Sequence, residues 1–263
     1  MPKLKSKVWN GVISAVFAIA VAVLILTFSI GLPIYFRPFY YMQIDADEIR
    51  DMVMLYSKHF DLGYIESDIT EQTIRDAFDE VMDFLTLGKE FGTGIFDYSE
   101  SGKSHFEDCK ILFDLNAAAL IISALTVGAV LILEKKRVIR LARPFGFNMI
   151  FIASVGMLAT FAVIGAAAAI NFDAAFTVFH KILFPGKSNW YFDPCYDGII
   201  FILTEEFFMA CGLLILVSIV LLTTAAITYG VIDRKRRGSS DTAQSTENTE
   251  QTAEAKDRAD QFT

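Results

Sequence analysis

The residues of this chain that are best suited to chemistry are two of its three histidines, His105 and His180. His105 precedes one long apolar segment, and His180 follows another. Side chains that titrate near neutral pH are rare beside hydrocarbon and mark functional sites when they occur there. Their placement at one membrane interface indicates a single reaction centre, although a loop histidine near a bilayer is more often an interfacial hydrogen-bonding group than a catalyst.

Each histidine lies in a segment that is dense in polar and aromatic side chains. In the first, residues 98–110, Asp108 follows His105 by three positions, so on a helix the two share a face and Asp108 could orient the imidazole or raise its pKa. The second, residues 179–208, holds further groups able to shape a site. These are Asn189, Trp190, Asp193, Asp197 and Glu205. Trp190 also fits the aromatic belt that membrane proteins place at the lipid–water interface.

Four apolar runs must position these segments, and each is long enough to cross a bilayer, which takes about 20 apolar residues. The expected spans are residues 12–32, 111–133, 145–170 and 207–232. A chain of 263 residues that is 54% hydrophobic is too apolar for a soluble domain. The first run follows several lysines as a secretory signal would, but its apolar core is too long for one, so we expect a retained anchor.

The orientation of the spans follows from their basic flanks. Three basic clusters fall on one side of a four-span topology, and basic loops stay in the cytoplasm. They are Lys3, Lys5 and Lys7; Lys135, Lys136, Arg137, Arg140 and Arg143; and Arg234, Lys235, Arg236 and Arg237. We therefore expect both termini in the cytoplasm and the histidines at the opposite, outer face of the membrane. Because every cluster adjoins a span, the sequence gives no support to nucleic-acid binding.

Between the first two spans lies an acidic segment, with seventeen Asp and Glu against six Lys and Arg in residues 39–110. Apolar residues recur at helical spacing in 45–58 and in 68–85, which predicts amphipathic helices. The tail is rich in Ser, Thr, Glu and Gln and is expected to be disordered. The chain is accordingly divided into a cytoplasmic head with the first helix (1–33), an extracytoplasmic cap domain (34–110), the second helix (111–133), a basic cytoplasmic loop (134–144), the third helix (145–170), an extracytoplasmic loop (171–206), the fourth helix (207–232) and a disordered cytoplasmic tail (233–263).

The fold class predicted is thus an all-α integral membrane protein with four transmembrane helices and a small helical cap. Signatures of other enzymes are missing, including G-x-S-x-G and H-E-x-x-H. The Gly-Lys-Ser triplets at 102–104 and 186–188 lack the upstream glycine of a phosphate loop, so we expect no nucleotide and no cofactor. Of the three cysteines, Cys211 lies within a span, and a disulfide between Cys109 and Cys195 is permitted on the outer face but not required by their spacing.

Together the two histidine segments resemble the lipoprotein intramolecular transacylases, a family of bacterial four-span membrane enzymes. The first pattern, Ser-Glu-x₄-His-Phe-x-Asp-x-Lys, runs from Ser99 to Lys110. The second runs from Phe179 to Phe208 and comprises Phe-His-x₂-Leu-Phe, Asn-Trp-x-Phe-Asp-Pro, Asp-x-Ile-Ile and Glu-x-Phe-Phe. The chain departs from the family at Cys109, where an apolar residue such as valine is usual, and at Thr204, where a proline is common. The first departure argues against Cys109 as a nucleophile.

The resemblance implies a transacylase that moves the sn-2 acyl chain of a diacylglyceryl-modified lipoprotein to the α-amino group of its N-terminal cysteine, giving the N-acyl S-monoacylglyceryl lyso-form. It implies that His105 and His180 are catalytic and that the partners are lipoproteins and membrane phospholipid, without nucleic acid, nucleotide, cofactor or metal. Residues expected to support the pair are Ser99, Asp108, Asn189, Trp190, Asp193, Asp197 and Glu205.

Two other interpretations stay open. The chain could be a non-catalytic lipid- or lipoprotein-binding membrane factor whose histidines are polar anchors at the interface. It could also be a metal-dependent lipid hydrolase, because histidine and carboxylate groups are plausible zinc ligands, although no compact spacing motif supports a metal site. The ligands would then be His105, Asp108, His180 and either Asp193 or Asp197.

Overall fold

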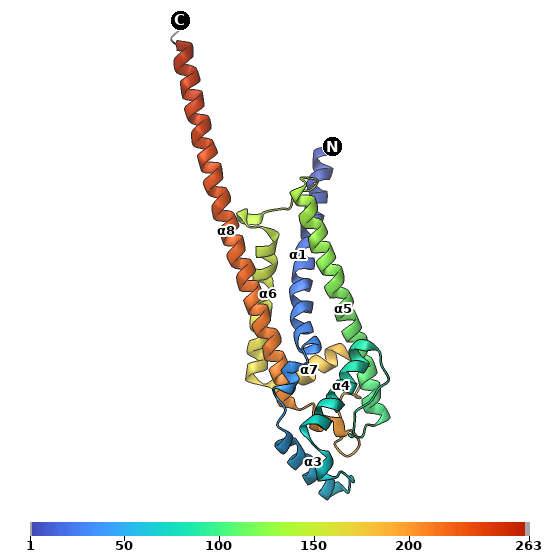
Figure 1. The fold of residues 1–263 in the computed structure, drawn as a ribbon. Helices are drawn as coiled ribbons and strands as arrows, with labels where there is room; N and C mark the ends of the chain where they lie inside the picture. Colours follow the sequence, from blue (N-terminus) through green and yellow to red (C-terminus); the bar gives the residue numbers. More distant parts are fainter. Residues whose placement is uncertain (1, 261–263) are drawn as a thin grey trace. The chain divides into compact units, whose positions relative to one another are not determined.

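The computed structural model describes residues 2–260 and places side chains over residues 8–240 and at Thr242. Within this part of the chain all regular structure is helical and no strand occurs, as the sequence predicts (Figure 1). The elements are α1 (Pro2–Tyr35), α2 (Pro38–Tyr41), α3 (Ala46–Phe60), the 3₁₀ turn η1 (Glu66–Asp68), α4 (Glu71–Leu87), α5 (Glu100–Lys135), the 3₁₀ turn η2 (Pro144–Gly146), α6 (Met149–Ile170), α7 (Phe172–Leu183), the 3₁₀ turn η3 (Gly198–Phe201) and α8 (Glu205–Asp260).

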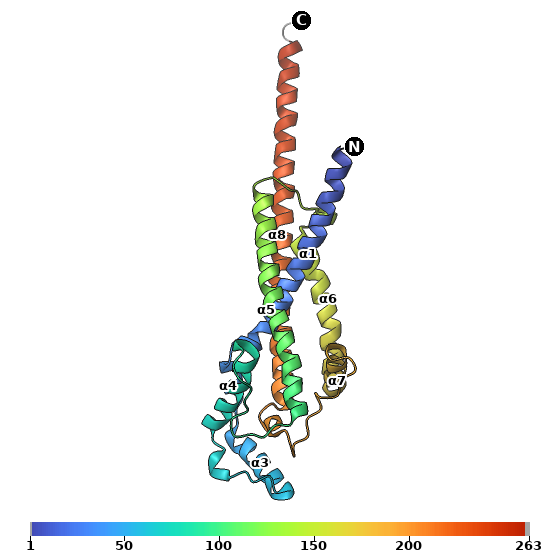
Figure 2. The same cartoon turned by 90° about the vertical axis from the view of Figure 1, so that its right-hand side faces the viewer.

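Four of the described helices are long and apolar enough to cross a membrane (Figure 2). The candidate spans are Val8–Tyr35, Glu100–Lys135, Met149–Ile170 and Glu205–Ser240. At most 28% of the most apolar window of any of these helices is buried inside the protein. Such an exposed apolar surface suits hydrocarbon rather than water.

Several helix boundaries differ from the sequence prediction, and the second span shows this at its start, because α5 begins at Glu100 rather than at residue 111. α6 begins at Met149, rather than at residue 145, because Phe145 and Gly146 have φ angles of 56° and 80°, which cannot continue a right-handed helix. α8 continues through Asp260, whereas the sequence predicts a disordered tail over 233–263. Its final third contains no proline and many Ala, Glu, Gln, Lys and Arg residues, so a helix nucleated in the span can propagate.

The chain divides into two compact units, which we describe separately. Unit 1 comprises Met1–Ala22, Leu125–Leu158 and Leu221–Thr263, and it therefore contains all three basic clusters. Within it, the carboxylate of Asp233 accepts hydrogen bonds from Arg143 at 2.6 Å, from Arg237 at 3.0 Å and from Asn148 at 3.3 Å. The bonds from Arg143 and Asn148 fasten the chain before α6 to α8, whereas the bond from Arg237 lies within α8.

Unit 2 comprises Val23–Ala124 and Ala159–Val220 and contains both histidine segments. Its core forms where α3 and α4 pack with η3, and the fully buried members are Val53, Ile69, Ile74, Ala77, Phe78, Val81, Ile199, Phe201 and Ile202. The amphipathic helices predicted at 45–58 and 68–85 are thus present as α3 and α4. α4 begins later than predicted because Thr70 caps it, accepting a hydrogen bond from the backbone N–H of Thr73 at 3.2 Å.

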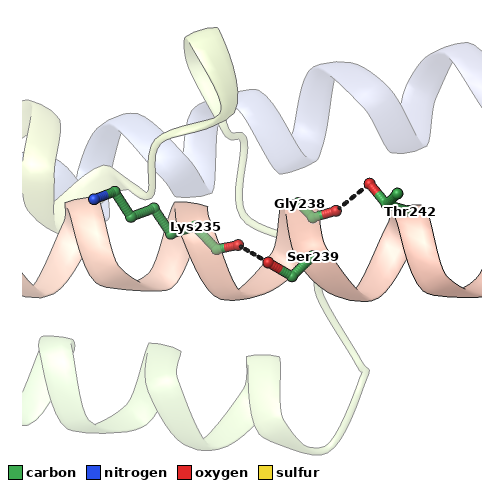
Figure 3. Close-up of a pocket in the computed structure, with 4 residues that line it drawn as sticks. All are labelled: Lys235, Gly238, Ser239 and Thr242. Atoms are coloured by element: carbon green, nitrogen blue, oxygen red, sulfur yellow. Dashed lines mark hydrogen bonds between the residues drawn. The ribbon is translucent and has the colours of Figure 1, made fainter.

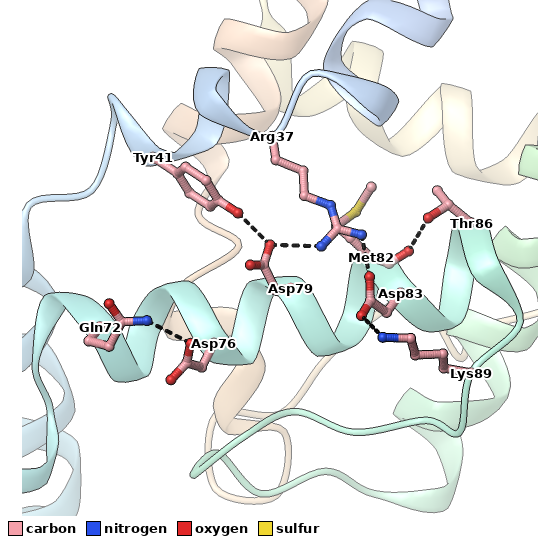
Figure 4. A network of polar contacts seen from close by, with 9 residues as sticks. All are labelled: Arg37, Tyr41, Gln72, Asp76, Asp79, Met82, Asp83, Thr86 and Lys89. Carbon is pink, nitrogen blue, oxygen red and sulfur yellow. Dashed lines mark hydrogen bonds and ion pairs between the residues drawn. The ribbon is translucent and has the colours of Figure 1, made fainter.

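A polar network in unit 2 ties the end of α1 to α4 (Figure 4). Arg37, two residues beyond α1, donates to Asp79 at 3.0 Å and to Asp83. The hydroxyl of Tyr41 donates to Asp79 at 2.6 Å, and Lys89 donates to Asp83 at 2.7 Å. The hydrogen bonds from Lys89 and Arg37 hold the pKa of Asp83 below its usual value, so this carboxylate stays charged near neutral pH.

Candidate functional site

Ser99 starts the helix that carries His105. Its Oγ accepts a hydrogen bond from the backbone N–H of Gly102 at 2.9 Å, and its carbonyl oxygen accepts one from Lys103 at 2.9 Å, so Ser99 is the N-cap of α5. Its own N–H donates to Asp197 at 2.8 Å. His105 therefore lies in the second turn of α5 rather than in a loop before the helix.

The ring of His105 is enclosed by aromatic side chains and is only 6% exposed. It meets Phe184 edge to face at 4.8 Å between centroids and Phe192 at 5.6 Å. Its Nε2 lies 3.4 Å from the sulfur of Cys109, one helical turn further along α5. Its Nδ1 is buried and has no hydrogen-bond partner among the described residues. One nitrogen of this ring is therefore occupied and the other is available to a ligand.

His180 lies in the last turn of α7, which Asn171 caps by accepting a hydrogen bond from Ala174 at 2.9 Å. Nδ1 of His180 donates to the carbonyl oxygen of Phe176 at 2.8 Å. In the neutral ring this bond places the proton on Nδ1 and leaves a lone pair on Nε2. Burial lowers the pKa of His180, partly offset by the Phe176 bond, so the ring is neutral near pH 7.

Although they are far apart in sequence, the two histidines lie together. Their ring centroids are 5.8 Å apart with an interplanar angle of 36°, and His180 is 7% exposed. Trp190 stacks on the ring of His180, with 4.9 Å between the ring centroids and an interplanar angle of 28°. Both imidazoles thus line one largely aromatic site within unit 2, at the start of α5 and the end of α7.

Asp108 does not contact His105 through a hydrogen bond in the described structure. Its carboxylate instead accepts hydrogen bonds from Lys187 at 2.5 Å and from Asn189 at 3.0 Å. The indole N–H of Trp190 donates to the carbonyl oxygen of Lys187 at 3.1 Å. Asp108 therefore fastens to α5 the loop whose tryptophan stacks on the second histidine, which differs from the orienting role that its spacing suggests.

Asp193 and Asp197 build the turn that follows Trp190. Oδ1 of Asp193 accepts a hydrogen bond from the N–H of Cys195 at 2.9 Å, and the Asp197 carboxylate accepts one from the N–H of Asp193 at 3.3 Å. Asp197 is 4% exposed and also receives the N–H of Ser99, so one carboxylate joins the turn to the start of α5. A Cβ at Gly102 would overlap this carboxylate, which explains the glycine.

Glu205 is the first residue of α8, where the hydroxyl of Thr204 accepts a hydrogen bond from Phe207 at 3.3 Å. The side chain of Glu205 interacts with Asp173 at the start of α7. Among the described residues, no hydrogen bond or ion pair joins it to either histidine. All three cysteines are free thiols, so the disulfide left open by the sequence does not form.

Three groups at the site do not follow from the motifs: the Cys109 thiol, the Phe176 carbonyl and Lys187. The first two lie four residues from a histidine on the same helix, so helical spacing would have found them had α5 and α7 been extended to include the histidines. The contact of Lys187 with Asp108 depends on the path of a loop and has no local sequence signal.

Two other features of the described residues do not make a site. No group of three or more His, Cys, Asp or Glu side chains there is placed to hold a metal ion. A shallow hollow on α8 in unit 1 is lined by Lys235, Gly238, Ser239 and Thr242 (Figure 3). The hydroxyls of Ser239 and Thr242 donate to carbonyl oxygens of their own helix, at 3.2 and 2.9 Å, so they do not converge on a ligand.

Comparison with known proteins gives one family. A model of the family described as lipoprotein intramolecular transacylase Lit matches residues 15–208 of this chain. None of the curated proteins matches it in sequence.

Solved structures of the membrane-integral lipoprotein intramolecular transacylase Lit from Bacillus cereus share its fold. One has 24% sequence identity and a TM-score of 0.71, and the match covers 87% of this chain and 97% of the other. A variant in which a histidine is replaced by arginine has 22% identity and a TM-score of 0.68, covering 91% and 98% of the two chains. An alanine variant has 22% identity and a TM-score of 0.66, covering 90% and 100%.

Proposed function

This chain belongs to the lipoprotein intramolecular transacylase family, whose members are acyltransferases, and on that premise we propose that His105 and His180 carry its reaction. The substrate is a diacylglyceryl-modified lipoprotein in the membrane. Its sn-2 acyl chain moves to the α-amino group of the N-terminal cysteine, and the product is the N-acyl S-monoacylglyceryl lyso-form.

The observation that carries this proposal is the buried pair of imidazoles, 5.8 Å apart, each with one ring nitrogen not bonded within the protein. Two such nitrogens can contact two atoms of one reacting group at the same time. In His180 the free atom is Nε2, and its lone pair suits a general base. In His105 it is the buried Nδ1.

The transfer begins with the neutral amine, because an α-ammonium group has a pKa of about 7.7–8.0 and must first lose a proton to water. As the amine nitrogen bonds to the carbonyl carbon of the sn-2 ester, Nε2 of His180 takes a proton from that nitrogen. The bond between the carbonyl carbon and the glycerol oxygen then breaks, and Nε2 returns the proton to the oxygen. An ester and an amine become an amide and an alcohol, and His180 regains its starting state.

His105 acts on the carbonyl oxygen, where negative charge develops in the tetrahedral intermediate, and a preorganised donor at that atom is among the largest contributions to catalysis. Conversion of an ester into an amide is downhill, so no nucleotide or cofactor is needed. Both reacting groups belong to one substrate molecule, so the protein needs only to orient them.

The aromatic walls of the site favour transfer over hydrolysis. Phe184 and Phe192 contact the ring of His105, and Trp190 covers one face of His180. These side chains leave little room for water beside the acyl carbonyl. The two segments are held together by Ser99, Asp108, Asn189, Asp193 and Asp197. Glu205, whose side chain interacts with Asp173, joins the start of α8 to the start of α7.

The site lies at the outer leaflet of the cytoplasmic membrane, with both termini in the cytoplasm. The three basic clusters support this orientation. Residues 34–110 then form a cap outside the membrane that restricts entry and includes His105, in the second turn of α5. In a chain without its native cysteines, an impermeant thiol reagent should label Ser67→Cys but not Ser239→Cys on intact cells, and the reverse pattern would contradict the orientation.

The reaction is tested by mass spectrometry of lipoprotein N-termini from cells that express the protein. His105→Ala and His180→Ala should each abolish the lyso-form, while His59→Ala, which lies outside both segments on α3, should retain it. Conversion near that of the unchanged protein in either site variant would refute the two-histidine mechanism.

The same measurement separates the other interpretations. A binding factor would leave lipoprotein acylation unchanged when the unaltered protein is expressed. A metal-dependent hydrolase would release free fatty acid without N-acylation and would lose activity with a chelator. The transacylase should be insensitive to chelators and should release no fatty acid.

A further inference from the structure

Cys109 is the only protein group within hydrogen-bonding distance of the His105 ring nitrogens in the part of the chain described here. It lies four residues after His105 on α5, so the two side chains share a helix face. Its sulfur is 3.4 Å from Nε2, it is a free thiol, and it is packed against the core of unit 2. The ring is buried, so water competes little with this contact.

The chemistry of the two groups sets the direction of the hydrogen bond. A thiol is a weak donor and also a weak acceptor, whereas the unprotonated nitrogen of a neutral imidazole is a good acceptor. The favoured arrangement is S–H donating to Nε2, which requires the ring proton to be on Nδ1. The Nδ1 atom of His105 is the buried atom without a partner, so it is an N–H that lacks an acceptor.

A buried N–H without an acceptor is costly, and native structures rarely keep one unless a ligand completes it. In His180 the roles of the two ring nitrogens are reversed: among the described residues, Nδ1 is hydrogen-bonded and Nε2 is not. The Nδ1–H of His180 donates to the carbonyl oxygen of Phe176, and the lone pair of its Nε2 remains able to accept a hydrogen bond. The free atoms of the pair are therefore one donor, on His105, and one acceptor, on His180.

We propose that Cys109 is a positioning residue that fixes the tautomer of His105, so that Nδ1–H is presented to the carbonyl oxygen of the sn-2 ester. This inference rests on the proposed function and deepens it. The thiol does not react: it forms no bond to the acyl chain, and its hydrogen bond to Nε2 persists through the reaction. The oxyanion supplies the acceptor that Nδ1–H lacks in the free enzyme.

The first test measures the tautomer directly. In the full chain labelled with ¹⁵N-histidine and held in detergent micelles, only three histidines contribute signals, and His59→Ala and His180→Ala variants assign them. At neutral pH the His105 signals should report a protonated Nδ1 and an unprotonated Nε2. A Cys109→Val variant should shift the ring toward a mixture of tautomers, whereas Cys109→Ser, which keeps a donor, should retain the original one. A protonated Nε2 in the unchanged protein would overturn the inference.

The second test measures the consequence for the rate. Loss of one neutral hydrogen bond corresponds to a decrease of about 3- to 10-fold, so Cys109→Val should lower kcat by that factor with little change in KM. Cys109→Ser should recover most of the loss, and the matched change Cys211→Val, in α8, should have no effect. Equal kcat for Cys109→Val and the unchanged protein would overturn the positioning role.

The two failures are distinguishable. If His105→Ala retains activity, the proposed function of His105 falls, and the role of Cys109 in catalysis falls with it. If His105→Ala is inactive but the ¹⁵N signals place the proton on Nε2, the proposed function stands and only the role of Cys109 is wrong.

Discussion

Replacing Asp108 with alanine should reduce activity by releasing a loop rather than by changing His105 directly. The carboxylate is 16% exposed and receives hydrogen bonds from Lys187 and Asn189, which lie on either side of Ser188 in the loop after α7. That loop carries Trp190, the side chain stacked on His180. Without Asp108, the loop is no longer bonded to α5, and Trp190 is no longer held against the ring of His180.

The contacts differ in strength, which allows a graded series. The Lys187 side chain is 49% exposed, so its ion pair contributes about 0–1 kcal/mol. The hydrogen bond from Asn189 to the charged, mostly buried carboxylate contributes about 1.5–3 kcal/mol. The free energy that holds the loop should therefore fall most in Asp108→Ala, by about 2–4 kcal/mol, less in Asn189→Ala and by no more than about 1 kcal/mol in Lys187→Met.

The assay is limited proteolysis of the purified protein in detergent, with cleavage within residues 184–197 read by mass spectrometry, together with the rate of lyso-form production. Both readouts should follow the order Asp108→Ala, Asn189→Ala, Lys187→Met. If Asp108→Ala lost activity while the other two variants matched the unchanged protein in both readouts, Asp108 would act on His105 itself and the loop argument would be refuted.

Two further predictions follow from groups in unit 2. His180 should titrate below the ordinary imidazole pKa of about 6.5 in a ¹⁵N NMR titration, because burial lowers its pKa. Since the unfolded chain then binds the proton more readily, stability should fall as pH decreases below about 6.5, and a midpoint above that value would show that burial does not dominate the pKa of this ring. Gly102→Ala should lower activity, because its Cβ would displace the carboxylate of Asp197. The control is Gly128→Ala on the same helix, where a Cβ meets no atom within 4 Å, and it should be neutral or slightly stabilising. Equal activity of the two variants would show that the start of α5 tolerates the displacement.

The sequence predicted those features that depend on local pattern. Apolar run length identified the four candidate spans, and helical spacing identified α3 and α4, because both signals are carried by neighbouring residues. The all-helical fold and the family are confirmed. Helix starts were less accurate: the residues before the second span are polar, so hydropathy excluded them, although Ser99 caps them into the same continuous helix.

The contacts around the two histidines could be predicted only in part. The motifs singled out Asp108, Asn189 and Trp190, and the structure places all three near the pair. Their partners were not predictable, because the path of residues 184–197 is fixed by long-range bonds such as that from Lys187 to Asp108. Spacing along α5 suggested that Asp108 serves His105, but a carboxylate pairs with the nearest available donors, and these come from the loop.

The contacts of the Asp197 carboxylate limit which substitutions this sequence can accept. It receives the N–H of Ser99 and that of Asp193, and Gly102 leaves the space that it occupies. A mutation at any one of these positions alters the fit of the others, so their effects should be epistatic: a side chain added at Gly102 becomes tolerable only after position 197 has shrunk. Substitutions at these positions should therefore become fixed in pairs. Preserving the alignment of the two histidines during evolution depends on this small group as well as on the histidines themselves.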